Sequence, residues 1–403
     1  MVLFKRSFVI WIFLMLSYGC VQSQVQQREE NTAAFGFYAV EAAPEWSDLF
    51  YKESGWFGAD GIFAIPANGK EAPGYANNSS SYLFFSDTMI GKAVEGSVFE
   101  HSDMVNNSVA IIHGDEPDAG NIEFYWAKNK EGEPKSLFTP QTPNSKEGEY
   151  LWLGDGFVNQ EKDDRMYLFA YRIQSTDTGM GFKETGNILI VIPPGSNPPF
   201  KNHRQLDTPL FLTGNDNESY GSFGAGVFVN TEAAEAPDPD GYVYVYGVKG
   251  QNKQLLAARV QPENFENFNH WEYWSQDGWD SDINSAVAIT DSVSNELSVY
   301  PVEEDKYVLI FQINGIGSNV GMRIGESPVG PFRSVKKLWN TEKITNKDDD
   351  FFAYNAKVHT NLSKPGELLI SYNINSFDFL SDLKNYPNLY RPRFIRLTLE
   401  ESN

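Results

Sequence analysis

The sequence contains a single cysteine, Cys20, so no disulfide can form within the chain. Cys20 also lies outside the expected fold, which excludes a cysteine nucleophile. With 5 histidines, a His-rich metal centre has little support. The sequence lacks a Gly-x-Gly-x-x-Gly dinucleotide loop, a P-loop and a His-Glu-x-x-His zinc helix. We therefore expect no nucleotide or other organic cofactor.

Positive charge is scarce as well. There are 32 Lys and Arg residues against 54 Asp and Glu residues, giving a net charge of −22. An acidic surface repels nucleic-acid phosphates and anionic lipid headgroups, so we expect neither as a partner. Neutral sugars are not repelled, and the 14% aromatic content supplies rings that stack on sugar faces. The composition favours a carbohydrate ligand and a monomer, although an acidic surface also serves solubility alone.

Residues 1–19 have the pattern of a signal peptide. Lys5 and Arg6 precede an apolar run at 7–16 that is too short for a membrane helix. Cys20 follows directly, and residues 16–20 resemble the lipobox of bacterial lipoproteins, although Ser17 stands where Leu is usual. In that family the cysteine carries the lipid.

The resemblance implies an exported bacterial lipoprotein on the periplasmic side or the cell surface, held to the membrane through Cys20. An ordinary secretory signal cut near residues 22–24 is the alternative. Residues 20–34 are polar and are expected to form a tether. Residues 35–403 are expected to form one domain.

No long stretch of that domain has a convincing helical period. Instead, short runs of alternating apolar and polar residues are separated by turns rich in Gly, Pro, Asp and Asn. The expected strands, grouped in five units, are 60–66, 81–86, 106–112 and 122–127; 150–158, 165–173, 186–192 and 206–212; 221–229, 242–248, 254–260 and 270–274; 297–301, 306–312, 320–325 and 335–339; 352–359, 367–373 and 393–399.

Repeating units of about four short strands are typical of a β-propeller. The fifth unit has three strands, and a segment at 35–40 could supply the fourth. We therefore predict an all-β, five-bladed β-propeller whose ring is closed by an N-terminal strand. A pair of β-sandwiches would also explain the aromatic content, but not the regular unit length or the unit with three strands.

Three units open with one acidic residue among apolar neighbours: Asp60, Asp155 and Glu296. The first strands of propeller blades line a central channel, so the three carboxyl groups are expected to converge. Paired carboxyl groups suit glycoside hydrolysis, which needs one protonated acid and one ionised carboxylate. Asp60 and Asp155 each precede a glycine and could instead form turns. Glu296 is expected in the middle of a strand, where a turn role does not apply.

Other polar and aromatic residues are placed to contact a sugar at the same channel mouth, and each also has a structural alternative. The candidates are Asp87, Asn106, Asn107, Trp152, Tyr354, Asn355 and His359. A lone histidine or tryptophan is more often part of the core, and Asp87 could cap a loop. Acidic runs at 277–282 and 348–350 could hold a structural Ca²⁺, but such runs are usually solvated.

Several short motifs resemble the five-bladed propeller glycoside hydrolases, the group of arabinanases, β-xylosidases and invertases. They lie at 58–62, 83–88, 105–108, 256–279 and 294–299, and they are most similar to secreted bacterial propeller proteins with relatives like endo-D-arabinanases. The resemblance implies that Asp60 is the base, Asp155 a modulating residue and Glu296 the acid. The acid of that group lies in the third unit, whereas Glu296 opens the fourth.

The sequence therefore predicts a glycoside hydrolase that acts on a pentose- or furanose-containing glycan. The alternative is a lipoprotein that binds a glycan in the same pocket without cleaving it. The three acids favour the enzyme, and the absence of an acid at the start of the third unit favours the binding protein.

Overall fold

A computed structural model describes residues 38–177, 181–214, 218–303 and 305–399. The expected signal peptide, Cys20 and the tether at 20–34 lie outside these residues. Within them strands are the main regular structure, and the α-helices are α2 (Pro44–Ser47), α3 (Glu342–Thr345) and α4 (Phe379–Asn385). The all-β prediction is confirmed. None of the helices in these ranges is long and apolar enough to cross a membrane.

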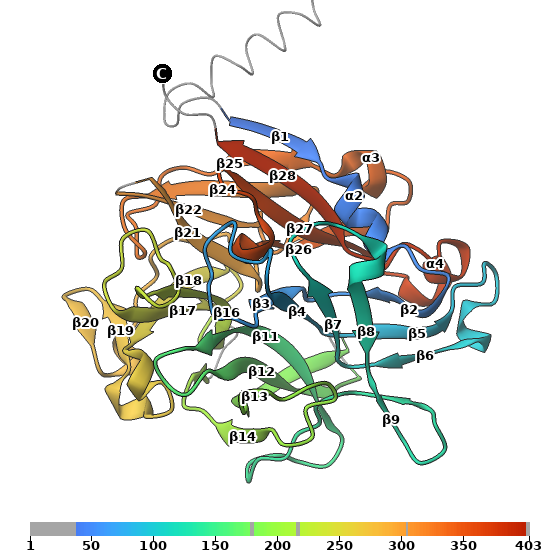
Figure 1. Cartoon of the computed structure of the whole chain (residues 1–403), viewed down its shortest axis with the longest axis horizontal. Coiled ribbons are helices and arrows are strands. Elements are labelled where there is room, and N and C mark those ends of the chain that lie inside the picture. Colours follow the sequence, from blue (N-terminus) through green and yellow to red (C-terminus); the bar gives the residue numbers. More distant parts are fainter. Residues whose placement is uncertain (1–37, 178–180, 215–217, 304, 400–403) are drawn as a thin grey trace, which may run out of the picture.

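Five antiparallel sheets follow the order of the five predicted units (Figure 1). They are β3 (Phe63–Pro66), β4 (Ser80–Phe85), β7 (Ser108–His113) and β8 (Ile122–Tyr125); β11 (Glu149–Asn159), β12 (Arg165–Ser175), β13 (Phe182–Ile192) and β14 (Arg204–Asp207); β15 (Phe211–Leu212), β16 (Gly221–Asn230), β17 (Tyr242–Lys249), β18 (Gln254–Val260), β19 (Glu272–Ser275) and β20 (Gly278–Asp280); β21 (Leu297–Glu303), β22 (Lys306–Gln312), β24 (Asn319–Gly325) and β25 (Lys336–Asn340); β1 (Tyr38–Ala42), β28 (Arg393–Leu399), β27 (Glu367–Ser376), β26 (Phe351–Val358) and β23 (Ile316–Gly317).

Two smaller sheets were not predicted from the sequence. One consists of β9 (Ala127–Lys128) and β10 (Pro134–Lys135), and the other of β2 (Ser54–Ala59), β5 (Thr88–Lys92) and β6 (Ser102–Val105). The second prolongs the first large sheet, because β2 leads into β3, β4 into β5, and β6 into β7 through two- or three-residue breaks. Those breaks contain Asp60, Asp87, Asn106 and Asn107.

The last large sheet takes its outer strand from the N-terminal end of the described chain. β1 pairs antiparallel with β28, with Tyr38 opposite Leu399. The backbone N–H of Ala43 continues this contact by donating to Phe394 O at 2.9 Å. The sequence placed this strand at 35–40, and it lies at 38–42.

The sheets are buried on both faces, and β12 illustrates the physical reason. Successive strand residues point to opposite faces, and both sets are apolar here. Met166, Leu168 and Ala170 belong to the hydrophobic cluster shared with the first sheet. Tyr167 and Phe169 belong to the cluster shared with the third sheet. The second sheet, which contains β12, is therefore packed between the first and third sheets.

The first strands of the sheets contact one another near the middle of the molecule (Figure 1). β11 contacts β3 on one side and β16 on the other, and β21 contacts β16 and β26. The turn at Thr360–Leu362, which follows β26, contacts β3. Polar side chains on these strands are therefore brought together from distant parts of the sequence.

Candidate active site

Three of the five first strands contain a bulge, and the other two begin just after a predicted acid. The pairing shifts register at Gly154–Asp155 in β11, at Gly224–Ala225 in β16 and at Asn355–Ala356 in β26. Asp60 lies between β2 and β3, and Glu296 directly precedes β21. Bulges of this kind redirect side chains and are frequent beside functional sites.

Two of these positions differ from the sequence prediction. Glu296 was expected in the middle of a strand, but β21 begins at Leu297. The preceding turn is fixed by Ser294, whose hydroxyl donates to Glu296 O and accepts from Gln312 N at 3.0 Å. Asp60 was expected to begin a strand, but that strand begins at Phe63. Both carboxyl groups are thus placed by breaks in the sheet rather than by regular alternation.

Glycines 58 and 61 make the break around Asp60 possible. Gly61 has a positive φ of 63°, a conformation that favours glycine. A Cβ atom on Gly58 would lie 2.2 Å from the carbonyl oxygen of Tyr390, so the close approach of that segment requires glycine. This approach brings Tyr390 to the Asp60 side chain.

Asp60 and Asp87 form a half-buried pair of carboxyl groups. Their segments are held together by the Asp60 N–H, which donates to Asp87 O at 3.2 Å, and by the Ser86 N–H, which donates to Asp60 O at 2.8 Å. Burial and the Asp60 charge raise the pKa of Asp87 to about 7. The side chain of Asn106 counteracts this by donating to Asp87 Oδ1 at 3.1 Å.

Two tyrosines surround the Asp60 carboxyl group. Tyr354 donates its hydroxyl hydrogen to Asp60 Oδ2 at 2.7 Å, and Asn375 donates to the Tyr354 hydroxyl oxygen at 3.1 Å. Burial raises the pKa of Asp60 to about 6, while hydrogen bonds from Tyr354 and Tyr390 limit the rise. At neutral pH this carboxyl group is therefore mainly ionised.

Glu296 is 9% exposed, and its Oε2 atom has no hydrogen-bond partner among the described residues. Burial raises its pKa well above the ordinary glutamate value, and the charges of Asp60 and Asp155 raise it further. The Lys357 ammonium and the Ile62 backbone N–H act in the opposite direction. Glu296 therefore holds its proton more firmly than an ordinary glutamate, and it lies within electrostatic reach of both predicted aspartates.

Asp155 is buried in an ion pair that joins four sheets. Its Oδ2 atom accepts from Lys357 Nζ at 2.6 Å and from the Val227 N–H at 2.7 Å. Lys357 Nζ also donates to Leu297 O at 3.1 Å. These partners come from β11, β16, β21 and β26. The pair therefore fixes the first strands relative to one another directly beside Glu296.

Trp152 lies beside Asp87 and lowers the pKa of that carboxyl group. Its ring contacts Phe182 edge-on, with centroids 4.5 Å apart, and Tyr150 at 5.9 Å. The indole N–H thus lies beside the Asp87 carboxyl group.

The remaining candidates, Asn107, His359 and Asn355, serve the backbone and the core rather than the carboxyl cluster. Asn107 is fully buried, donating to Phe138 O and Leu151 O at 3.0 Å and accepting from the Phe138 N–H at 2.8 Å. His359 is 1% exposed and bonds through Nε2 to Ser371 Oγ at 2.7 Å. Burial lowers the pKa of His359 to about 3, so its ring is neutral. Asn355 occupies the β26 bulge with a φ of 59°. The structure therefore gives Asn107 and His359 structural contacts and places Asn355 in a bulge of the backbone.

Sequence reasoning missed several residues of this site. The charged ones are Glu71, Glu184 and Lys357, and the tyrosines are Tyr171 and Tyr390. Burial raises the pKa of Glu184 to about 8, and Glu184, Glu296 and Asp155 all raise the pKa of Tyr171. Lys357 could have been noticed, because a lysine in the apolar run at 351–358 is unusual. Glu71 and Glu184 lie in polar stretches, where a glutamate does not stand out.

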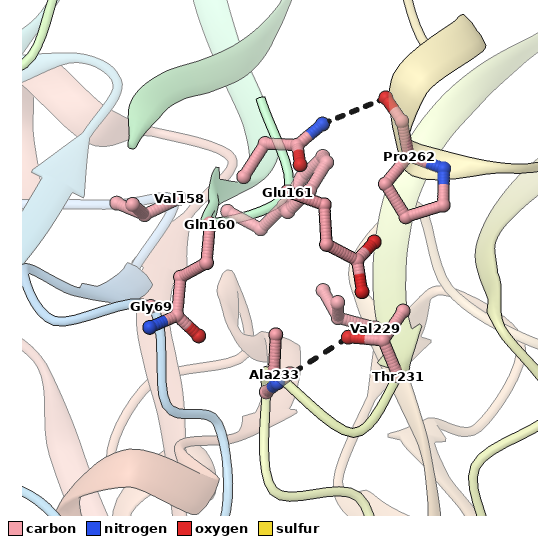
Figure 2. Close-up of a pocket in the computed structure, with 11 residues that line it drawn as sticks. Gly69, Val158, Gln160, Glu161, Val229, Thr231, Ala233 and Pro262 are labelled. Atoms are coloured by element: carbon pink, nitrogen blue, oxygen red, sulfur yellow. Dashed lines mark hydrogen bonds between the residues drawn. The ribbon is translucent and has the colours of Figure 1, made fainter. Parts of the chain in front are cut away.

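A small pocket lies away from the carboxyl cluster, at the C-terminal ends of β11 and β16 (Figure 2). Figure 2 shows the Glu161 carboxylate pointing into it between Pro262 and Thr231. Asn159 donates to Pro262 O at 2.8 Å and thereby closes one side. None of the residues predicted for the site lines this pocket.

Of the two acidic runs considered for Ca²⁺, the run at 348–350 takes part in a carboxylate group. Asp348, Asp350 and Asp382 each offer an oxygen within 4.8 Å of the others. Ser376 donates to Asp382 Oδ2 and so occupies part of this group. No comparable group includes residues 277–282 among the described side chains.

Residues 44–399 match the profile of a family described as a domain of unknown function, DUF5005. The chain belongs to the DUF5005 family. A search of curated proteins finds no match. A crystal structure from Bacteroides ovatus ATCC 8483, of a protein provisionally described as a hydrolase, is 20% identical to this DUF5005 chain with a TM-score of 0.66. The alignment covers 89% of this chain and 90% of that one, so the two share a fold.

Other solved structures match the DUF5005 chain less closely. The α-L-arabinofuranosidase PaAbf62A of Podospora anserina, crystallised with cellotriose, is 15% identical over 87% of this chain and 92% of its own, with a TM-score of 0.43. An endo-arabinase of Bacteroides thetaiotaomicron VPI-5482 is 13% identical over 85% and 98%, with a TM-score of 0.42.

Proposed function

We propose that this DUF5005 protein is a glycoside hydrolase that acts on a pentose- or furanose-containing glycan. Glu296 is the general acid, Asp60 is the base or nucleophile, and Asp155 positions and tunes Glu296. The observation that carries the proposal is the placement of Glu296 and Asp60 at one site, where burial and the Asp60 charge raise the pKa of Glu296. Glycoside hydrolysis requires such a pair.

The environment of each carboxyl group supports its role. Asp60 accepts hydrogen bonds that stabilise its ionised form, and its pKa is about 6. Glu296 is more deeply buried and lies beside negative charge, which raises its pKa well above the ordinary value. Glu296 thus holds its proton more firmly than an ordinary glutamate, while Asp60 is ionised above a pH of about 6, as the two sides of a glycosidic bond require.

The ion pair Asp155–Lys357 supports the tuning role. Asp155 raises the pKa of Glu296 and Lys357 lowers it, so the balance between them sets how firmly Glu296 keeps its proton. Both side chains are 5% exposed, which keeps solvent from screening this effect.

The proposal includes the architecture of the site. We take the five large sheets as the blades of a five-bladed β-propeller, with β1 closing the ring beside β28. The contacts between first strands and the β1–β28 pairing support this arrangement.

The direct test is incubation of the purified protein with arabinan, arabinoxylan, xylan and galactan, followed by measurement of new reducing ends. We expect product from at least one of these polymers. Saturable binding to a polymer without product from any of them would overturn the catalytic assignment. The anomeric form of the first product, measured by NMR, would then show whether Asp60 acts as base or nucleophile.

The pH profile gives a more specific prediction. The base must be ionised, so the rate is expected to fall as the pH drops below the Asp60 pKa of about 6. Tyr354→Phe removes a hydrogen bond that lowers this pKa, so the acid limb of the profile should move to higher pH. Tyr75→Phe is the control, because the Tyr75 hydroxyl bonds to Glu235 on the surface at 3.1 Å. An unchanged acid limb in Tyr354→Phe would contradict the role of Asp60.

One observation favours the alternative, a glycan-binding protein without catalysis. The β16 bulge carries Gly224 and Ala225 at the position where the β11 bulge carries Asp155, so the third sheet contributes no acid there. A binding protein would hold a glycan at the same carboxyl groups and release it unchanged. The reducing-end assay separates the two functions.

We also propose that the protein is an exported lipoprotein anchored through Cys20. This rests on the sequence pattern of residues 1–20. Cys20→Ser is expected to move the protein from the membrane fraction to the soluble fraction when it is expressed in a bacterium with lipoprotein processing. Fractionation followed by immunoblotting measures the change. A Cys20→Ser variant that stays in the membrane fraction would contradict the anchor.

A further inference from the structure

A strip of aromatic side chains leads from Asp60 to the molecular surface. Tyr354 and Phe352 are two residues apart on β26 and share a face, with ring centroids 5.4 Å apart. Phe377, directly after β27, continues the strip, with its ring 4.5 Å from that of Phe352. We call these three residues the aromatic strip.

The strip runs outward from Tyr354, which packs against the core, to Phe377 at the surface. Phe351, on the other face of β26, is buried against Tyr386, with ring centroids 5.4 Å apart. Phe352 and Tyr354 are half-buried, and Phe377 is 61% exposed. A single exposed aromatic ring needs no explanation. Here, however, the exposed ring is the outer end of a contiguous series whose inner end donates a hydrogen bond to Asp60.

The carboxyl groups have aromatic neighbours on their other side too. Trp152 lies beside Asp87, and its ring contacts Phe182, which is 37% exposed. Asp60 and Asp87 are thus flanked by aromatic rings on β26 and on β11. Flat rings beside polar acceptors match the apolar faces and hydroxyl edges of sugars.

We propose that the aromatic strip forms outer subsites on which successive rings of a neutral glycan chain stack. The substrate is then an oligosaccharide or polysaccharide rather than a single sugar. This inference rests on the proposed function, because it places the reacting unit at Asp60 and Glu296. The continuity of the strip with Asp60 through Tyr354 links the surface to the reacting carboxyl groups.

The charges around the strip specify a neutral chain. The Phe377 N–H donates to Asp350 O at 3.1 Å, and Asp349 and Asp350 are exposed. Their carboxylates, together with the net charge of −22, disfavour a glycan that carries uronate or sulfate groups. Asn375, opposite Phe352 across the β26–β27 ladder, supplies an amide edge next to the rings.

The test measures affinity as a function of chain length. Calorimetry would use Glu296→Gln protein, in which turnover is blocked, with arabino-, xylo- and galacto-oligosaccharides of two and five units. With the glycan that binds, Phe377→Ala is expected to weaken pentamer binding about tenfold, the effect of losing one aromatic stacking contact. Binding of the two-unit oligosaccharide, which ends before the outer ring, should change less than twofold.

Two further variants keep the result interpretable. Phe377→Trp retains a stacking surface and should restore pentamer binding, whereas Tyr75→Ala, which removes a 41% exposed ring on another loop, should leave it unchanged. If Phe377→Ala bound the pentamer as tightly as the parent protein, the aromatic strip would not form outer subsites. The same conclusion would follow if Phe377→Ala weakened binding of both oligosaccharide lengths equally. Neither result would contradict the proposed function. If the Glu296→Gln protein bound none of the oligosaccharides, both the proposed outer subsites and the proposed function would be wrong.

Discussion

Glu296→Gln is expected to lower the rate of glycan hydrolysis by about a hundred- to ten-thousand-fold, the usual contribution of a general acid. Glutamine has nearly the shape of glutamate but cannot deliver a proton to the leaving oxygen. Glu296 Oε2 has no hydrogen-bond partner among the described residues, so the substitution breaks no hydrogen bond of that atom. The kcat measured on the polymer that yields product reports the change.

Asp60→Asn should have an effect of similar size, because it removes the ionised carboxylate that activates water or attacks the sugar. Glu161→Gln is the matched control, since Glu161 lines the separate pocket of Figure 2. Its rate should equal that of the parent protein. Normal turnover by both Glu296→Gln and Asp60→Asn would contradict the catalytic assignment. The comparison requires that both variants have the same unfolding temperature as the parent protein.

Lys357→Met is expected to cost about 3–5 kcal/mol of the free energy of unfolding, because it leaves the Asp155 carboxylate buried without its partner. The two side chains are 5% exposed and 2.6 Å apart, so water cannot replace the lost ammonium. Urea unfolding followed by tryptophan fluorescence measures the difference. The double variant Lys357→Met/Asp155→Asn should recover part of it, because no buried charge remains unpaired.

The control for this prediction is an exposed ion pair with a similar distance. Lys364 Nζ lies 2.9 Å from Glu116 Oε1, with side chains 52% and 65% exposed. Lys364→Met is expected to change the free energy of unfolding by about 0–1 kcal/mol, because solvent screens surface pairs. If Lys357→Met were no more destabilising than Lys364→Met, the ion pair would not be what fixes the first strands.

The strand content was predictable because strand formation depends on local alternation. The five groups were placed in the right order, although the strand expected at 206–212 is divided between β14 and β15, which belong to different sheets. A segment near residue 40 was expected to join the last group, as β1 does. The small sheet of β2, β5 and β6 was missed. Its strands run on from those of the first sheet after breaks of two or three residues, and such breaks leave little trace in apolar periodicity.

The candidate site was predictable only in part. Asp60, Asp155 and Glu296 stood out because a carboxyl group among apolar neighbours is costly to bury unless it is paired. Asn107 looked equally suited to a ligand, yet its amide is occupied by the backbone of Phe138 and Leu151. The sequence cannot distinguish these cases, because the partners of Asn107 lie 31 and 44 residues away.

The residue pattern along the chain was enough to establish the all-β class, the order of the strands and three acids worth testing. Those features follow from short-range alternation and composition. The pairing of Asp155 with Lys357 and of Asp60 with Tyr354 joins residues 202 and 294 positions apart. Contacts at such separations exist only after the sheets have packed, so the protonation states and the aromatic strip were decided by the tertiary structure.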